Sequence, residues 1–222
     1  DEKKGDATPP VVKRPNKPNV EPKPEDLKLV EAGEDEVRFN FRGAPWLVVL
    51  EELARVSNFN LDWQELPGDY LNLVTRRTYS VVEARDVINR HLLTRGYTMI
   101  LHDRTLSVIS LKDIKNLNPA VVPEVKPEDL TNLMPHEFVR TSFQIDSLIA
   151  KELEEQLKPL ISPEHGRLNA VESLNRLEAM DTVANLQQIQ KLLVAANSDR
   201  GQERLIKEFV LEHTRAAETL VQ

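Results

Sequence analysis

Histidines are the first residues of this sequence to consider for metal binding or acid–base catalysis. A zinc-binding helix typically places two histidines four residues apart, and many hydrolases pair a histidine with a nucleophile. The five histidines are scattered, and no two of them have the helical zinc spacing: His91, His102, His136, His165 and His213. The chain also has no cysteine, which removes thiolate ligands, a cysteine nucleophile and disulfide bonds. The sequence therefore predicts no metal site.

Carboxylates, serines and glycines complete the search for catalytic chemistry. The acidic groups at 51–52 and 152–155 fall on the outward faces of expected helices, where solvated side chains belong. No serine lies in a Gly-x-Ser-x-Gly turn, and the seven glycines are all isolated, so the sequence has neither a nucleophile elbow nor a phosphate-binding loop. We therefore predict no catalytic residue, no cofactor and no enzymatic activity.

The composition narrows the class of protein further. The chain has 222 residues, enough for two small domains, and a formal net charge of −7, whereas nucleic-acid-binding surfaces are basic. No apolar run reaches the roughly 18 residues that a membrane-spanning helix needs. Because the sequence begins with Asp1 and shows no signal-peptide pattern, we expect a mature chain or an excised fragment.

Shifts in composition divide the chain into five segments. Residues 1–36 are rich in proline and charge and predict a disordered N-terminal tail. A first folded module is expected over 37–111, a proline-rich linker over 112–137 and a second module over 138–197. Residues 202–222 begin another strand and helix that the chain does not complete. The predicted fold class is α+β, with two small mixed α/β modules in series.

The first module alternates between strand and helix patterns. Residues 37–41 alternate apolar and polar side chains, as a half-buried strand does. A helix is predicted over 46–57, and a second helix over 81–93 begins at the cap residue Ser80 and ends at Gly96. A hairpin then closes the module.

The second module has the order strand, helix, hairpin, helix. Its expected elements are a strand (138–143), a helix (148–157), two hairpin strands (167–171 and 176–180) and a last helix from residue 183. Asp181 and Thr182 are expected to cap that helix. Its core-facing stripe should be Val183, Leu186, Ile189 and Leu193.

Residues 166–189 resemble the ring-building repeat of bacterial secretins, which has a KH-like topology. In that repeat one strand leads into a Ser/Thr-x-Asn turn, and Asp-Thr opens a helix with Asn in its first turns. Asn175, Asp181, Thr182 and Asn185 stand at the matching positions. We expect structural roles for them, because Asn tolerates the turn backbone and Asp favours the positive end of a helix.

The first module resembles another domain of the same family. Residues 37–54 combine an aromatic-rich strand, a Gly-x-Pro break at Gly43 and a Leu-x-x-Leu-Ala helix, and they look like the amino-terminal domain of secretins. That domain is also the signalling domain of TonB-dependent receptors. The two resemblances follow the family's own order, and residues 202–222 look like the opening of a second, truncated repeat.

The resemblance implies a periplasmic location, attached to an outer-membrane channel for protein secretion (type II or III) or for type IV pilus extrusion. It implies a homo-oligomeric ring in the full-length protein and an inner-membrane platform component as partner, with the membrane reached only through regions outside this chain. Arg38 and Asn40 point outward on a first strand that could be a sheet edge, so we expect them to contact a partner.

Two alternatives stay open. The chain could be the signalling or docking domain of a TonB-dependent receptor, although a plug and barrel would then follow the first domain in place of a ring repeat. It could also be a KH-like nucleic-acid-binding module. The KH fold clamps nucleic acid with a Gly-x-x-Gly loop, however, and this acidic chain has none.

Overall fold

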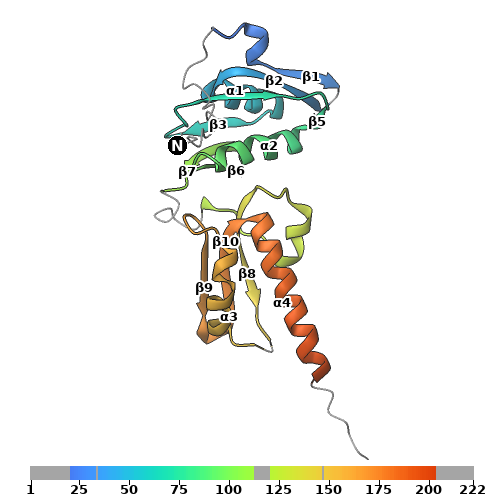
Figure 1. The fold of residues 1–222 in the computed structure, drawn as a ribbon, viewed down its shortest axis with the longest axis vertical. Helices are drawn as coiled ribbons and strands as arrows, with labels where there is room; N and C mark the ends of the chain where they lie inside the picture. Colours follow the sequence, from blue (N-terminus) through green and yellow to red (C-terminus); the bar gives the residue numbers. More distant parts are fainter. Residues whose placement is uncertain (1–20, 34, 113–120, 147, 204–222) are drawn as a thin grey trace, which may run out of the picture.

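Two α/β modules follow one another along the long axis of the molecule (Figure 1). The computed structural model describes residues 21–33, 35–112, 121–146 and 148–203. The predicted fold class, two small mixed α/β modules in series, is confirmed. The disorder predicted for residues 1–20 lies outside the described residues.

The first module contains two sheets with two helices. One sheet has the strand order β1-β2-β4, with β5 also paired to β2; the other has the order β3-β7-β6. Both helices contact strands of both sheets. The elements are η1 (Pro24–Leu27), β1 (Leu29–Gly33), β2 (Glu36–Pro45), α1 (Trp46–Ser57), β3 (Asn60–Trp63), β4 (Tyr70–Val74), β5 (Tyr79–Ser80), α2 (Val81–Leu93), β6 (Tyr97–His102) and β7 (Thr105–Ser110).

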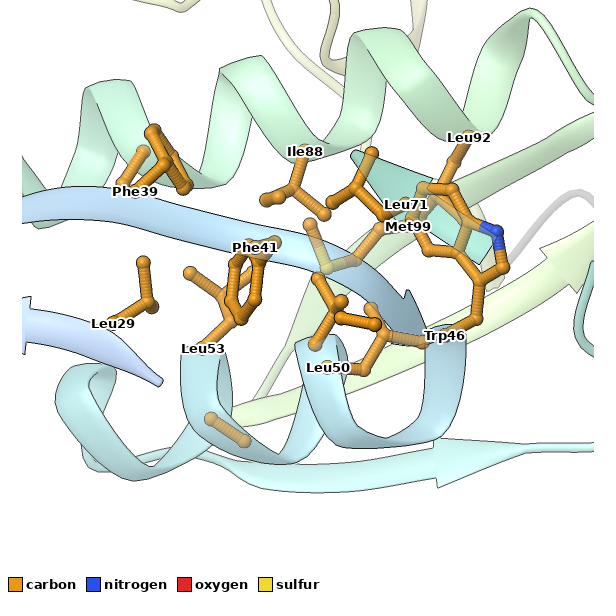
Figure 2. Packing of buried hydrophobic residues seen from close by; sticks show 14 of the residues in the cluster. Leu29, Phe39, Phe41, Trp46, Leu50, Leu53, Leu71, Ile88, Leu92 and Met99 are labelled. Carbon is orange, nitrogen blue, oxygen red and sulfur yellow. The ribbon is translucent and has the colours of Figure 1, made fainter. Parts of the chain in front are cut away.

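The core of the first module lies where β2 and the two helices meet. Figure 2 shows aromatic side chains of β2 converging with leucines of α1 and with Ile88 and Leu92 of α2. Most of these side chains are completely buried. Burial of this apolar surface is the main force that holds the two sheets to the helices.

Local signals set both helices of this module, and their predicted bounds are confirmed. The Ser80 side chain accepts a hydrogen bond from the Glu83 amide, and the Glu83 carboxylate accepts one from the Ser80 amide. This capping box satisfies donors that the first turn of α2 would leave unpaired. The Ser80 hydrogen bonds hold the pKa of Glu83 below its usual value. Gly96, with φ of 81°, supplies the left-handed backbone that follows the helix end.

The predicted tail over 1–36 is too long, because its last part belongs to the first sheet. Residues 29–33 form β1, which pairs antiparallel with β2 and places Leu29 opposite Phe39. Leu29 is buried in the core. A short apolar stretch among charges gives little strand signal by itself, and only pairing with β2 makes the strand stable.

Gly43 also behaves differently from the prediction that it breaks the first strand. β2 continues to Pro45, and its register against β4 shifts between Arg42 and Ala44. Gly43 has φ of 67°, and its amide donates to Asn72 Oδ1 at 2.8 Å. The residue therefore makes a β-bulge, which bends the strand without ending it.

The second module is a three-stranded antiparallel sheet of order β8-β10-β9 with α3 and α4 on one face. The core-facing stripe predicted for the last helix is buried as expected. The elements are η3 (Pro127–Asn132), β8 (Phe138–Gln144), α3 (Ala150–Leu157), η4 (Lys158–Leu160), β9 (Arg167–Val171), η5 (Glu172–Leu174), β10 (Arg176–Thr182) and α4 (Val183–Glu203).

Two predicted boundaries of this module need correction. Residues 121–137 are not a free linker, because Leu130 is fully buried and the Gln187 and Gln190 amides of α4 donate to backbone oxygens of η3. α4 also continues beyond residue 197 to Glu203. Apart from the last two residues of α4, the truncated repeat predicted over 202–222 lies outside the described residues.

Candidate functional site

Within the described residues, no group of three or more His, Asp or Glu side chains is placed to hold a metal ion. No helix in the part of the chain that the structure describes is long and apolar enough to cross a membrane.

The sheet of the second module has a polar face on the side opposite α3 and α4. Residues alternate between the two faces of a strand, and Leu177 and Ala179 of β10 are buried toward the helices. Glu178, between them, points to the other face and lies opposite Ser142 of β8 and Asn169 of β9. A hollow of about 100 Å³ on this face is lined by charged, polar and apolar side chains.

Arginines and carboxylates share this polar face. Arg140 Nη2 donates to Glu124 Oε2 at 2.6 Å. Arg140 of β8 and Arg167 of β9 lie on either side of Met180 of the central strand β10. Arg176 occupies the same face near the other end of β10. Such a face suits a protein surface better than a small apolar ligand, whose pockets are mostly hydrophobic.

Both edge strands of the second module's sheet, β8 and β9, are partly protected from pairing with another chain. The Arg140 amide of β8 donates to Pro123 O, and the Arg140 carbonyl accepts from the Val125 amide, each at 2.9 Å. On the other edge, the Ala170 amide of β9 donates to Glu154 Oε2 of α3 at 3.2 Å. The hydrogen bond from Lys151 is the main reason that the pKa of Glu154 lies below its usual value. Charged side chains on an edge disfavour strand addition by another chain.

Asn175 holds the turn of the hairpin against the start of α3. Its backbone is left-handed, with φ of 46°. Its side chain accepts from the Ala150 amide at 2.9 Å and donates to Ile145 O at 2.7 Å and Leu148 O at 2.9 Å. The first amide of α3, at Ala150, is thus capped by a residue 25 positions away. These hydrogen bonds agree with the structural role expected for Asn175, which stays a prediction.

Asp181 lies at the centre of a second hydrogen-bond cluster, the Asp181 network, formed by Asp181, Ser162 and Asn185. The buried Asp181 carboxylate accepts from the Ser162 amide at 2.6 Å, from Ser162 Oγ at 2.8 Å and from Asn185 Nδ2 at 3.0 Å. It also accepts from the Thr182 amide at 2.7 Å. The network joins the loop after α3 to the first turn of α4.

Gly166 packs against the same network. A Cβ at this position would lie 2.7 Å from Asp181 Oδ2 and 2.8 Å from Ser162 O, and it would also collide with the Ile161 side chain. The close approach of the backbone therefore requires glycine here.

The cap predicted for the last helix is only partly right. The Asp181 carboxylate accepts a hydrogen bond from the Thr182 amide, but the first amides of α4 donate to other acceptors. The Val183 amide donates to Glu137 O at 2.8 Å, and the Ala184 amide donates to Pro135 O at 2.9 Å. A distant backbone segment supplies these acceptors, so spacing within the motif could not have shown them.

Arg38 and Asn40 lie on the outer face of the first sheet, but not at its edge. β2 is an inner strand with β1 on one side and β4 and β5 on the other. The expectation that this strand could be a sheet edge is therefore wrong. Arg38 is exposed, while Asn40 is half-buried and donates to Glu25 O at 3.0 Å. Contact of these two residues with a partner stays a prediction, now for a sheet face.

Comparison with solved structures shows a shared fold. Neither a protein-family model nor a curated protein matches the chain in sequence. A chain of the Klebsiella pneumoniae type II secretion system outer membrane complex, which contains PulD, PulS and the PulC HR domain, matches 71% of this chain at 14% identity, with a TM-score of 0.59. The match covers 26% of that chain, so the present chain spans about a quarter of its length.

Two further solved structures are secretin fragments or complexes. The N-terminal domain of the secretin XcpQ from Pseudomonas aeruginosa, in a mutant form that is a dimer, matches over 73% of this chain and 65% of its own length at 16% identity and a TM-score of 0.30. The enterotoxigenic Escherichia coli GspC–GspD complex matches over 73% of this chain and 99% of the other at 12% identity and a TM-score of 0.28. Only the Klebsiella superposition is close enough to show a shared fold, and that fold agrees with the resemblance drawn from the sequence.

Proposed function

We propose that this chain is the periplasmic ring-forming and partner-docking region of an outer-membrane secretin channel, used for protein secretion or pilus extrusion. The observation that carries the proposal is the tandem itself. Both modules occur in one chain in the order expected of that family, and together they superpose on a chain of an outer-membrane secretion complex. A TonB-dependent receptor would be expected to continue into a plug and barrel after the first module, whereas this chain continues into a second α/β module.

Ring formation is supported by the two opposite sides of the second module. The polar sheet face carries Arg140, Arg167 and Arg176, and the exposed side of α3, across the sheet, carries Glu152 and Glu155. A contact between the sheet face of one copy and the helix side of the next is head-to-tail, and such contacts form a ring when the rotation from copy to copy closes. Since the sheet edges are partly protected, faces are the better candidates for this contact. One weak contact repeated around a ring gives stability through multivalency.

The full-length protein is expected to form a large, detergent-resistant multimer in the outer membrane. The reason is that the channel-forming region would hold many copies close together and drive ring closure. The measurement is membrane fractionation of the native cell, followed by electrophoresis with and without heating. A full-length protein that stays soluble and monomeric would contradict the proposal, whereas a monomer of the isolated chain would not.

Charge reversal by Arg38→Glu is expected to weaken binding of the inner-membrane platform component by about tenfold or more while the fold is kept, because it places an acidic group in the face proposed to dock. The measurement is titration of the platform component's periplasmic domain with this chain, at two salt concentrations. Arg90→Glu, on the exposed side of α2, is the matched control. Equal affinity for Arg38→Glu and the unchanged chain would remove the first-sheet face from the docking surface.

A further inference from the structure

The two modules are joined by polar contacts between α2 and the segment 135–137. Asp86 Oδ1 accepts from the His136 amide at 2.9 Å, and Asp86 Oδ2 lies 2.8 Å from His136 Nδ1. One residue earlier on α2, Arg85 Nη2 donates to Glu137 Oε1 at 2.7 Å. Two adjacent residues of the first module therefore bind two adjacent residues of the second.

Asn89, one turn along α2, extends these contacts into the first module. Its Nδ2 donates to His136 O at 2.6 Å, while its Oδ1 accepts from the Met99 amide at 2.8 Å and from Thr98 Oγ1 at 3.3 Å. Asp86 and Asn89 are 8% and 2% exposed. Buried polar groups of this kind cost free energy whenever their partners are removed.

The same segment also reaches the last helix. The Glu137 and Pro135 carbonyls accept from the first two amides of α4, as described above. Residues 135–137 thus bind α2 through side chains and His136 backbone groups, and bind α4 through backbone carbonyls. We name the group Arg85, Asp86, Asn89, His136 and Glu137 the interdomain clamp.

An apolar cluster lies between the modules as well. Ile100 and Leu111 of the first module pack with Val122, Phe138 and Met180, and none of these five side chains is more than 7% exposed. Apolar contact alone is non-directional and would tolerate small rotations. The hydrogen bonds of the clamp are directional, so rotation of one module against the other would break the bonds that Asp86 and Asn89 Nδ2 make with His136.

We propose that the interdomain clamp makes the two modules one rigid unit, so that the angle between the docking module and the ring-forming module is fixed in this chain. Domains in one chain ordinarily move relative to each other unless their interface is large. With the clamp, a partner bound on the first sheet would be held at a fixed orientation to the ring. This functional consequence rests on the proposed function, but the rigidity itself is a property of the chain alone.

The test is a distance measurement between spin labels on the two modules. The chain has no native cysteine, so labels can be placed at Glu51→Cys on α1 and Gln156→Cys on α3, two exposed helical positions. In the otherwise unchanged chain, double electron–electron resonance is expected to give one narrow distribution of distances between the two labels. In the variant with Arg85→Ala and Asp86→Ala, the distribution is expected to widen about twofold or more, because the modules then behave as separate domains.

The control removes an ion pair that lies inside one module. Arg42→Ala with Asp26→Ala deletes a 3.5 Å pair of the first module and should leave the distribution narrow. If the clamp double variant does not fold, Arg85→Ala alone removes one cross-module ion pair and should still widen the distribution. A broad distribution in the unchanged chain, or clamp variants as narrow as the control, overturns the proposal. Absence of an outer-membrane multimer would overturn the ring function and leave this distance result unaffected.

Discussion

Asp181→Ala is expected to lower the free energy of unfolding of the second module by about 3–5 kcal/mol, the range seen when one partner of a buried charged network is removed. The carboxylate is completely buried and accepts from four donors on three residues. Truncation leaves the Ser162 amide without its charged acceptor and opens a space beside Gly166. Stability of a whole domain is only about 5–15 kcal/mol, so the loss is large. Urea unfolding followed by circular dichroism measures it.

Two variants separate this network from a general effect of charge. Asp181→Asn keeps the shape of the side chain but turns one acceptor into a donor, so we expect a loss between zero and that of the alanine variant. Glu178→Ala removes a carboxylate from the same strand on the exposed face and should change the free energy of unfolding by about 0.5 kcal/mol or less. If Asp181→Ala and Glu178→Ala unfold at the same urea concentration, the network is not what holds α4 to the loop after α3.

The helices of the first module were predictable because their signals are local. α1 begins directly after Pro45, and α2 begins directly after Ser80, whose side chain bonds the Glu83 amide. Both are local start signals that a sequence pattern can show. The core-facing residues Ala84, Ile88 and Leu92 follow from apolar spacing and are buried. A helix carries this information within its own length, since its hydrogen bonds join residues four apart.

Features that depend on distant contacts were not predictable in this way. Asp86 and Asn89 are polar positions on α2, which sequence patterns assign to solvent, yet the second module covers them. The strand β1 and the packed part of the connector depend likewise on partners elsewhere in the chain. Of the proposed surfaces, the outward direction of Arg38 followed from alternation, whereas the position of its strand inside the sheet required the complete topology.

The motif residues show what a resemblance can add to local signals. Asn175, Asp181 and Asn185 were assigned structural roles because they match a repeat, and the structure gives each a set of long-range hydrogen bonds. Ser162, which bonds both Asp181 and Asn185, belongs to no part of that motif. Only the folded chain shows that the loop after α3 passes beside the end of β10.

Asn175→Ala is expected to lower the free energy of unfolding of the second module by about 3 kcal/mol, from roughly 1 kcal/mol for a left-handed alanine and about 2 kcal/mol for the lost side-chain hydrogen bonds. The part-buried Ala150 amide and the Ile145 and Leu148 carbonyls would lose their partner. Urea unfolding measures the total, and amide hydrogen exchange at Ala150 reports the start of α3 directly.

Asn175→Gly separates the two causes, because glycine accepts φ of 46° without strain but makes none of the three side-chain hydrogen bonds. We expect it to lose about 2 kcal/mol, less than alanine, with equally fast exchange at Ala150. Equal stability of the glycine variant and the unchanged chain would show that the backbone conformation alone matters at this turn. If the side chain matters, its loss also frees the start of α3, whose acidic outer side is part of the proposed ring contact. Both variants should then weaken the multimer of the full-length protein to the same extent, because both lose the hydrogen bond to the Ala150 amide.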